Sequence, residues 1–370
     1  HPQSSTPTRS EYISGKNKRK GSVRIMRGNY FLGAHRASKF EMREMTFGPL
    51  GSGEVLLKVH ACGVCGTDVH IYHGEEGSAA VTPPVVLGHE LSGVVEKVGS
   101  GVTLCRPGDH VAVDPNIYCG KCRPCRMGRK QNCRSLYAIG VNTNGGFAEY
   151  CVVPQQQCIV LDKNTDLDVA AMMEPLACAI HGVDNLDIRP GENVLIIGGG
   201  TIGLIMVQLA KLSGAAKVLL SEPVEIRQRI GLEVGATAVV NPITEDLGAK
   251  MREVFGADGA DAVIECVGNT KAVSQAIASA GPGGKVLIFS VPSVGTSVEL
   301  PLMDVFKKEL KITGSIINPD TNQRAADLID SGRIEIKKLI THTFDIHHLE
   351  EAIRCQMGNE SIKVMVKPKL

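Results

Sequence analysis

The chain has 370 residues, of which 43% are hydrophobic, and a formal net charge of +1. This length exceeds what one ordinary hydrophobic core supports, so we expect two domains. The interspersed charges exclude the basic surface of a nucleic-acid-binding protein. No apolar run is long enough to cross a membrane, and the first 22 residues lack the hydrophobic core of a signal peptide, so we expect a cytoplasmic protein.

Polar residues dominate the start of the chain, and short alternating segments follow. Residues 1–22 include the basic run Lys16-Asn-Lys-Arg-Lys20, which is typical of a solvated tail, so we expect disorder there. Three short segments alternate apolar and polar residues and are bounded by glycine and proline: Val55–His60, Leu91–Val98 and His110–Val113. This alternation predicts a β-rich first half.

Three separated segments carry side chains that zinc prefers. Cys65 opens the sequence Cys-Gly-Thr-Asp, His89 is followed by Glu90, and Glu174 precedes a proline. Cysteine, histidine and carboxylate groups are the usual zinc ligands. Each residue alone is equally typical of a buried cysteine, an interior histidine or a helix-capping acid, so spacing does not join them into one site.

Four cysteines lie in one short, basic, loop-like segment. They are Cys119, Cys122, Cys125 and Cys133. Four thiolates at this spacing predict a tetrahedral zinc site without an open position, which is structural rather than catalytic. The alternative is a pair of disulfides, which requires an oxidising compartment. The remaining cysteines are scattered and single, which favours the metal.

From about residue 193 the pattern changes to apolar strand, glycine turn and helix, and then repeats. The expected strands are Val194–Ile197, Lys217–Ser221, Ala238–Val240, Ala262–Glu265, Val286–Ser290 and Ile312–Ile316. Six strands with interleaved helices predict a doubly wound parallel sheet. The expected elements after it are a helix over 323–331, a strand near 342, a helix over 349–357 and a strand over 363–366.

The first of these strands runs into a glycine-rich turn. Gly198, Gly200 and Gly203 have the spacing GxGxxG, with Thr201 and Ile202 between the last two. In a dinucleotide-binding turn, the first glycine permits the tight bend, the second lets the backbone approach a pyrophosphate, and the third lets the helix pack on the sheet. Because a strand precedes the motif and a helix follows it, these five residues predict a cofactor site.

An acidic residue, Glu222, follows the second strand of the predicted sheet. A carboxylate there accepts hydrogen bonds from the adenosine ribose and repels a 2′-phosphate, which favours NAD over NADP. Three residues nearby in the sequence could instead bind a 2′-phosphate, so NADP is not excluded: Ser221, Arg227 and Arg229. A solvated acid at a helix N-terminus is the alternative role for Glu222.

Taken together and in this order, the motifs resemble those of the zinc-dependent medium-chain dehydrogenases of the alcohol dehydrogenase superfamily, from about residue 23 to residue 370. The resemblance implies that Cys65 and His89 ligate a catalytic zinc ion. Glu174 occupies the place of a third cysteine ligand in alcohol dehydrogenases, as in the polyol, butanediol and threonine dehydrogenase branches. In those branches either Glu90 or this glutamate ligates, directly or through water, so the third ligand stays open.

The same resemblance implies a reaction and a proton route. A catalytic zinc ion acts as a Lewis acid on a secondary alcohol, and a hydride passes to NAD. Thr67 and His70 match the family's proton relay, and Lys363 matches a basic residue that approaches the cofactor pyrophosphate. Asp68 to Tyr72 resembles threonine dehydrogenases, whereas Ser221-Glu-Pro is more similar to butanediol and polyol enzymes, so the substrate stays open.

The expected fold class is therefore α/β, with a GroES-like β-rich catalytic domain over 23–177 and 318–370 and a Rossmann domain over 178–317. We expect one catalytic and one structural zinc ion, NAD, a small-molecule alcohol substrate and a homo-oligomer, dimer or tetramer, with no nucleic-acid or membrane partner. The alternatives are an NADP-preferring enzyme of the same family, a zinc-independent reductase of the superfamily, and a non-catalytic zinc- and nucleotide-binding protein. The ligand set argues against the second, and the pair Thr67 and His70 argues against the third.

Overall fold

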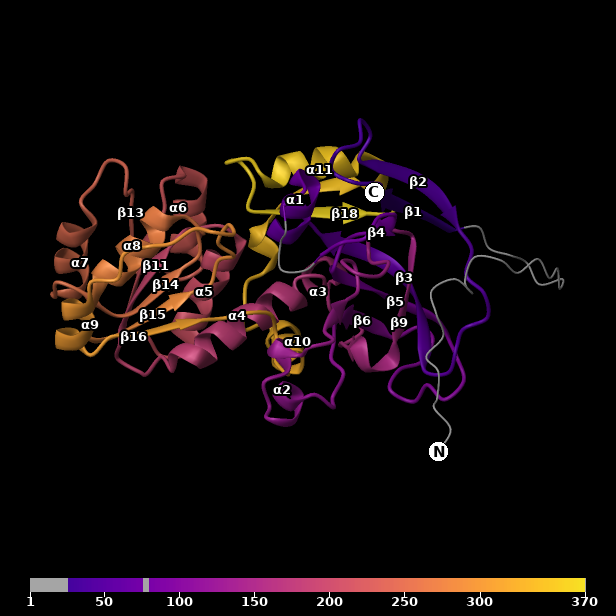
Figure 1. The fold of residues 1–370 in the computed structure, drawn as a ribbon, viewed down its shortest axis with the longest axis horizontal. Helices are drawn as coiled ribbons and strands as arrows, with labels where there is room; N and C mark the ends of the chain where they lie inside the picture. The colour runs from indigo at the N-terminus through magenta and orange to yellow at the C-terminus, as the bar shows by residue number, and fades with distance from the viewer. Residues whose placement is uncertain (1–25, 76–79, 370) are drawn as a thin grey trace.

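The computed structural model describes residues 26–75 and 80–369. A β-rich lobe and a lobe built on a parallel sheet lie at opposite ends, with helices α4 and α10 between them (Figure 1). The tail predicted for residues 1–22 lies outside the described residues. Within the described part of the chain, no helix has the length and apolar character needed to cross a membrane.

Two sheets form the main body of the β-rich lobe. The three-stranded sheet has the order β2–β1–β4, and the seven-stranded sheet has the order β10–β6–β5–β3–β18–β17, with β9 also paired to β3. The strands are β1 (Met26–Phe31), β2 (Phe40–Met45), β3 (Glu54–Gly63), β4 (Val85–Val86), β5 (Glu90–Val98), β6 (His110–Val113), β9 (Tyr150–Pro154), β10 (Cys158–Val160), β17 (Ile340–Asp345) and β18 (Lys363–Lys367).

The three strands predicted in the first half are β3, β5 and β6. They pair antiparallel, and the last strand of the chain, β18, joins the same sheet through Met365 opposite Gly63. This pairing returns the C-terminal segment to the end of β3, which Cys65 follows. The helices of this lobe are α1 (Gly66–His73), α2 (Arg123–Arg126), α3 (Leu167–Ala170), α10 (Asn322–Asp330) and α11 (Leu349–Gln356). The small sheet of β7 (Asn116–Ile117) and β8 (Tyr137–Ala138) flanks the four-cysteine segment.

The second lobe contains the predicted doubly wound sheet. Its six strands have the order β13–β12–β11–β14–β15–β16, and every neighbouring pair is parallel. The strands are β11 (Asn193–Ile197), β12 (Lys217–Ser221), β13 (Ala238–Val240), β14 (Ala260–Glu265), β15 (Ala280–Ile288) and β16 (Lys311–Gly314). The helices are α5 (Thr201–Leu212), α6 (Glu225–Glu233), α7 (Leu247–Phe255), α8 (Thr270–Ser279) and α9 (Leu302–Lys308). The predicted fold class is thus confirmed.

The fifth and sixth strands differ from their predicted bounds. β15 starts earlier than predicted, at Ala280, because Ala280 pairs with Ala260. A register shift follows this pair and accommodates the glycine-rich bend of β15. It ends at Ile288, where the Phe289 N–H donates to the Glu265 carbonyl (3.1 Å). β16 ends at Gly314 rather than at residue 316.

One continuous apolar core joins the lobes. Helix α4 (Met173–Leu186) packs on α5 and α10, and Leu176 and Ala177 within it are fully buried. Thr321 before α10 donates its hydroxyl to the Ala177 carbonyl (2.7 Å). The boundary expected between residues 177 and 178 therefore falls inside one uninterrupted helix, and α4 holds Glu174 rigidly relative to both lobes.

Candidate functional site

Cys65, His89 and Glu90 come together because β3 and β5 are paired. Gly63 lies opposite Glu90 in the register of the two strands, so the residues after β3 meet the residues that open β5. The possible ligand atoms of Cys65, His89 and Glu90 all lie within 4.8 Å of one another. A sulfur, an imidazole nitrogen and a carboxylate oxygen at this spacing form a donor set suited to zinc.

Asp68 supports this cluster from the first turn of α1. Its Oδ2 accepts the Cys65 backbone N–H (2.9 Å), and its Oδ1 lies 3.8 Å from His89 Nδ1. Burial alone lowers the pKa of His89, but the neighbouring Cys65 and Asp68 outweigh it and raise that pKa well above its usual value. A carboxylate behind a ligating histidine fixes ring orientation and tautomer. Sequence reasoning gave Asp68 no role, although its place three residues after Cys65 predicts a capping contact.

Glu90 forms an ion pair with Lys363, and both side chains are buried. Lys363 Nζ also donates to the Val64 carbonyl (2.9 Å). Burial lowers the pKa of Lys363, but Glu90 and Cys65 raise it further, so the net shift is upward. Lys363, which the resemblance assigned to the cofactor pyrophosphate, is thus engaged beside the metal-ligand cluster.

Glu174 lies in the first turn of α4 and is buried. Burial raises its pKa, while His89 lowers it and Glu90 raises it, which shows that the three groups share one electrostatic environment. One turn later, the Cys178 thiol donates to Glu174 Oε1 (3.2 Å). The Cys178 thiol therefore faces a carboxylate of the site, a contact that the sequence alone does not indicate.

Asp114 and Tyr118 flank β7 on the side of Glu174. Burial raises the pKa of Asp114 to about 7, although the Asn116 N–H lowers it, and Glu174 raises it further. Burial likewise raises the pKa of Tyr118, and the neighbouring carboxyl groups of Asp114, Asp320 and Glu174 raise it further. Sequence reasoning assigned neither residue a role, and no local pattern marks them.

Thr67 and His70 lie on one face of α1, three residues apart and half-buried. His70 Nδ1 is 2.5 Å from Glu75 Oε2, and the Glu75 side chain is exposed. The helix therefore carries a series of polar groups from the half-buried Thr67 to solvent. Glu75 extends the relay expected from the sequence.

The glycine-rich turn has the geometry that its motif requires. Gly198 has φ +99°, which favours glycine. A Cβ at Gly203 would lie 1.8 Å from the Gly198 carbonyl oxygen, so α5 packs against the turn only without a side chain there. At Gly200, by contrast, no other heavy atom lies within 4 Å of an added Cβ. The turn thus leaves open space at its middle glycine, where a pyrophosphate would approach.

Glu222 and Arg227 lie beside this turn. The Glu222 carboxylate accepts the Gly199 N–H (2.5 Å) and the Val224 N–H (2.8 Å), which fixes it at the end of β12. Each of its oxygens keeps a lone pair for a further donor. Arg227 donates from one terminal nitrogen to the carbonyls of Gly358 (3.1 Å) and Ser361 (2.9 Å).

A single segment of the chain connects the turn to the metal-ligand cluster. Thr201 in the turn donates its hydroxyl to the Ile362 carbonyl (2.6 Å), and the next residue, Lys363, pairs with Glu90. The glycine-rich turn and the Cys65–His89 cluster thus bind adjacent residues of one segment. Ile202, the remaining residue predicted for the cofactor, is half-buried in the first turn of α5.

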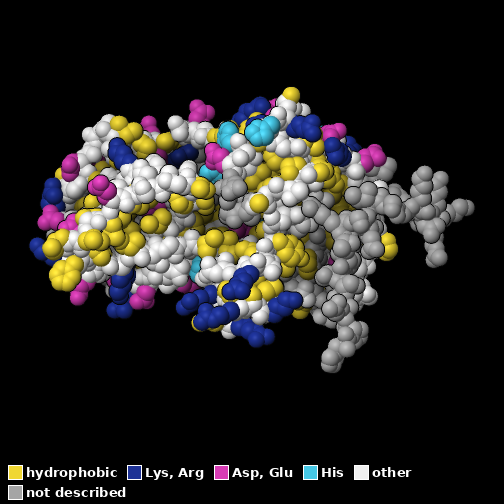
Figure 2. Space-filling view, viewed as in Figure 1, with side chains coloured by type: hydrophobic (Ala, Val, Ile, Leu, Met, Phe, Trp, Pro, Cys, Tyr) yellow, Lys and Arg dark blue, Asp and Glu magenta, His cyan; other side chains and the backbone are white. Residues whose placement is uncertain are grey.

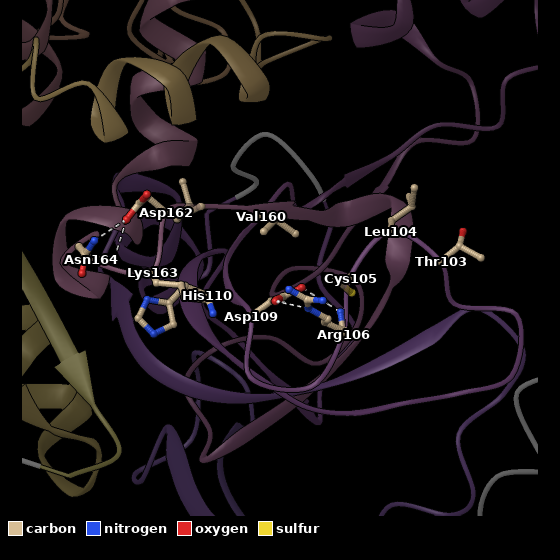
Figure 3. A pocket seen from close by; sticks show the side chains of 11 residues that line it. Thr103, Leu104, Cys105, Arg106, Asp109, His110, Val160, Asp162, Lys163 and Asn164 are labelled. Carbon is tan, nitrogen blue, oxygen red and sulfur yellow. Dashed lines mark hydrogen bonds and ion pairs between the residues drawn. The ribbon is translucent and has the colours of Figure 1, made fainter.

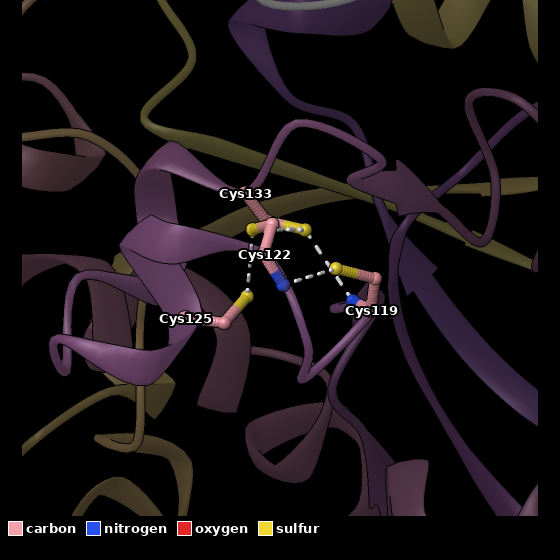
Figure 4. A group of neighbouring side chains, drawn as sticks. All are labelled: Cys119, Cys122, Cys125 and Cys133. Carbon is pink, nitrogen blue, oxygen red and sulfur yellow. Dashed lines mark hydrogen bonds between the residues drawn. The ribbon is translucent and has the colours of Figure 1, made fainter.

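The four clustered cysteines point toward a common centre (Figure 4). Cys122 Sγ lies 3.5 Å from Cys125 Sγ and 3.9 Å from Cys133 Sγ, while the Cys122 N–H donates to Cys119 Sγ (3.4 Å). Sulfur atoms about 2.3 Å from a tetrahedral zinc ion are about 3.8 Å apart. The spacing fits a zinc site, and every cysteine is free, so the disulfide alternative is not supported.

Comparisons with known proteins agree with this geometry. The family described as "Alcohol dehydrogenase GroES-like domain" matches residues 51–163, and "Zinc-binding dehydrogenase" matches residues 201–331. L-threonine 3-dehydrogenase of Caldanaerobacter subterraneus is 35% identical, with 86% of this chain and 92% of that protein covered. The chain belongs to the zinc-dependent medium-chain dehydrogenases. This confirms the resemblance, and the protein is an NAD(P)-dependent, alcohol-type oxidoreductase.

Solved structures place this dehydrogenase among close architectural relatives. A protein of Sinorhizobium meliloti, described as a zinc-binding dehydrogenase bound to NADP, is 40% identical with a TM-score of 0.89, covering 93% of this chain and 100% of that one. The 2R,3R-butanediol dehydrogenase of Bacillus subtilis is 27% identical with a TM-score of 0.83, covering 93% and 100%. Each of these two relatives is matched along its whole length by 93% of this chain.

The four-cysteine lobe of the dehydrogenase carries a strongly basic surface. Its exposed or half-buried cations are Lys121, Arg123, Arg126, Arg129, Lys130 and Arg134. Figure 2 shows this dark blue group over the region of α2. Four thiolates around a divalent ion have a net charge of −2, which nearby cations balance, and Lys130 additionally pairs with Asp320 (2.6 Å).

A surface groove of about 670 Å³ lies elsewhere in the β-rich lobe, between residues 103–110 and 160–164 (Figure 3). Arg106 and Asp109, which both line it, form an ion pair (3.5 Å). Cys65, His89 and Glu174 are not among the residues that line it. The groove is therefore separate from the metal-ligand cluster.

Proposed function

We propose that this dehydrogenase oxidises a small secondary alcohol, such as a polyol, a diol or an L-threonine-like compound, with NAD as the hydride acceptor. The observation that carries the proposal is the convergence of Cys65, His89 and Glu90 within 4.8 Å, one segment away from the glycine-rich turn. The names of its relatives, L-threonine 3-dehydrogenase and 2R,3R-butanediol dehydrogenase, support this substrate range.

Four side chains are the proposed ligands of the catalytic metal ion. We infer that Cys65 and His89 supply sulfur and nitrogen ligands, and that Glu90 and Glu174 supply the oxygen donors. When bound, zinc polarises the alcohol oxygen and NAD accepts the hydride. Asp68 lies behind His89, with its Oδ1 3.8 Å from Nδ1, and Cys178 orients Glu174 by donating to Oε1 (3.2 Å).

The proton leaves the substrate along α1. The Thr67 hydroxyl takes up the substrate proton and passes it toward His70, whose Nδ1 faces Glu75 Oε2 at 2.5 Å. Because Glu75 is exposed, the proton reaches solvent from its carboxylate. This route gives His70 the role of a shuttle between a half-buried hydroxyl and water.

The choice of NAD rests on Glu222. Its buried carboxylate lies at the end of β12, where an adenosine ribose is bound in such sheets, and its charge opposes a 2′-phosphate. The NADP bound to the relative from Sinorhizobium meliloti makes NADP the alternative. Arg227 binds the carbonyls of Gly358 and Ser361 through one terminal nitrogen, and its Nε has no partner among the described residues.

The test is oxidation of a panel of polyols, diols and L-threonine with NAD and with NADP, together with zinc analysis of the same sample. We expect activity with NAD on at least one substrate class and about two zinc ions per chain, one in each proposed site. Zinc in the four-cysteine site alone, with no activity on any substrate, would contradict the proposal.

We further propose that residues 23–177 and 318–370 form the catalytic domain and that residues 178–317 form the Rossmann domain. We also propose a cytoplasmic location. The separate sheets of the two lobes support the division. Free cysteines in a metal-suited cluster support a reducing compartment.

A homo-oligomer, dimer or tetramer, is proposed from one apolar surface. No residue of α9 is buried, and Leu302, Met303 and Phe306 are 73%, 61% and 78% exposed. The neighbouring β16 is an edge strand of the parallel sheet. Figure 2 shows hydrophobic side chains gathered at this end of the molecule. An exposed edge strand beside a large apolar patch suits pairing with a second copy.

We expect Phe306→Asp to convert the oligomer to a monomer, because the substitution places a charge in the centre of the patch. Sedimentation velocity measures the change. Leu104→Asp, at a residue 57% exposed in the other lobe, is the matched control and should leave the oligomer intact. An unchanged sedimentation coefficient for Phe306→Asp would exclude this face as the interface.

A further inference from the structure

Glu265, the last residue of β14, carries a fully buried carboxylate. Its Oε1 accepts the N–H groups of Val267 and Gly268 (both 2.7 Å), and its Oε2 accepts the Ser290 hydroxyl. All three of these partners are uncharged. Burying a carboxylate among neutral partners costs free energy, which makes Glu265 a candidate for a functional role.

Glu265 lies at the point where the strand order of the parallel sheet reverses. The order is β13–β12–β11–β14–β15–β16, so the chain leaves β11 toward one edge and returns at β14 toward the other. Ligands of doubly wound sheets bind outside the carboxyl ends of the strands at such a point. Ile197 and Glu265 are the last paired residues of β11 and β14, and an added Cβ at Gly198 would lie 2.8 Å from Val267 Cγ2. The Glu265 turn therefore packs directly against the glycine-rich turn.

The order of the strands indicates which half of the cofactor lies over Glu265. Glu222 at the end of β12 is the proposed partner of the adenosine ribose, and the turn after β11 is the proposed pyrophosphate site. The nicotinamide half then extends to the other side of that turn, over β14 and β15. Val267 and Val291 follow these strands and are exposed, and an added Cβ at Gly268 would lie 3.5 Å from the Val291 carbonyl oxygen. The two strand ends thus meet and offer an apolar surface to the ring.

The loops around this surface carry no charged side chain. The glycine-rich turn and the loops after β14, β15 and β16 contain no Lys, Arg, His, Asp or Glu over residues 198–203, 266–270, 289–296 and 315–319. None of these loops balances the charge of Glu265. Because the electrostatic effect of a charge is stronger in a buried environment than in water, the carboxylate influences groups that it does not contact.

We propose that the buried Glu265 carboxylate selects the oxidation state of the cofactor, because its negative charge stabilises the positively charged nicotinamide ring of NAD and not the neutral ring of NADH. The inference rests on the proposed function, in which NAD is the hydride acceptor. Its hydrogen bonds to the Val267–Gly268 turn and to Ser290 hold the carboxylate below the surface that faces the ring. A site of this kind favours binding of the oxidised cofactor and release of the reduced one, as alcohol oxidation requires.

The experiment measures the dissociation constants of NAD, NADH and ADP-ribose for zinc-loaded wild type and Glu265→Gln by calorimetric titration. We expect the ratio of the Kd for NAD to the Kd for NADH to rise about tenfold in Glu265→Gln, since one buried charge is removed. The affinity for ADP-ribose, which lacks the nicotinamide ring, should not change. Glutamine retains the local geometry, because its Oε1 accepts the two N–H groups and its Nε2 donates to the Ser290 oxygen.

Three further variants separate charge from structure. Ser290→Ala removes a hydrogen bond but keeps the charge, and Glu253→Gln removes a charge from the exposed face of α7, so both should keep the wild-type ratio. Glu265→Asp keeps the charge on a shorter side chain, so its ratio should also stay at the wild-type value even where the melting temperature falls.

An unchanged ratio in Glu265→Gln, or an equal loss of affinity for NAD, NADH and ADP-ribose, would overturn the inference. A rise of the ratio in Glu253→Gln or in Glu265→Asp that matches the rise in Glu265→Gln would overturn it as well. Failure of the wild type to bind NAD would instead overturn the cofactor of the proposed function, and the inference with it.

Discussion

Cys65→Ser is expected to reduce kcat/KM for alcohol oxidation about a thousandfold while the chain stays folded. Polarisation of the substrate oxygen by the metal contributes several kcal/mol of transition-state stabilisation, and about 4 kcal/mol corresponds to a thousandfold change in rate. Cys65 is the only sulfur donor in the cluster with His89 and Glu90 among the described residues, and serine binds zinc more weakly than a thiolate. Zinc content should fall from about two ions to about one per chain.

The control is Cys355→Ser, which changes a half-buried cysteine of α11 in the same way. It should retain both zinc ions and wild-type kinetics. Circular dichroism and the melting temperature of Cys65→Ser separate loss of the metal from loss of the fold. If this variant kept two zinc ions and its activity, Cys65 would not be a ligand.

The parallel sheet was predictable because its evidence is local. Each strand from Asn193 to Val240 is a short apolar run bounded by glycine or polar residues, and Gly198, Gly200 and Gly203 add a motif with a known geometry. β15 was harder, because its first residues include Pro282 and Gly283, which indicate a turn. Its pairing with β14 overrides that local preference through a register shift.

The metal-ligand cluster was predictable only through resemblance. Cys65 and His89 are far apart in the sequence, and they meet because Gly63 pairs with Glu90 across two strands. No periodicity in either segment encodes that register. The four-cysteine lobe is different, since all its donors lie in one segment whose spacing alone indicates a tetrahedral site.

The supporting residues were missed for a physical reason. Asp68 and Cys178 act through burial and through side-chain partners, which a single sequence does not display. Cys178 is a good example, because a lone cysteine in an apolar helix is usually a packing residue. Its thiol has a site role only because Glu174 lies one turn earlier on the same face of α4.

Two alanine substitutions in the glycine-rich turn are expected to separate folding from cofactor binding. A Cβ at Gly203 would lie 1.8 Å from the Gly198 carbonyl oxygen, so Gly203→Ala must displace α5 from β11. We expect a loss of about 3 kcal/mol in the free energy of unfolding, as for an overpacked core. Urea denaturation of the enzyme without cofactor measures this loss.

Gly200→Ala is the matched change with the opposite expectation. Its φ of −69° suits alanine, and no other heavy atom lies within 4 Å of the new Cβ, so the urea midpoint should equal that of the wild type. The methyl group nevertheless occupies the space through which a pyrophosphate approaches the helix N-terminus, so the dissociation constant for NAD should rise about tenfold, or 1.4 kcal/mol. Calorimetric titration with NAD measures it. The two variants add the same methyl group three residues apart. If Gly200→Ala kept the wild-type affinity for NAD, the pyrophosphate would bind elsewhere, and the stability of Gly203→Ala would not alter that conclusion.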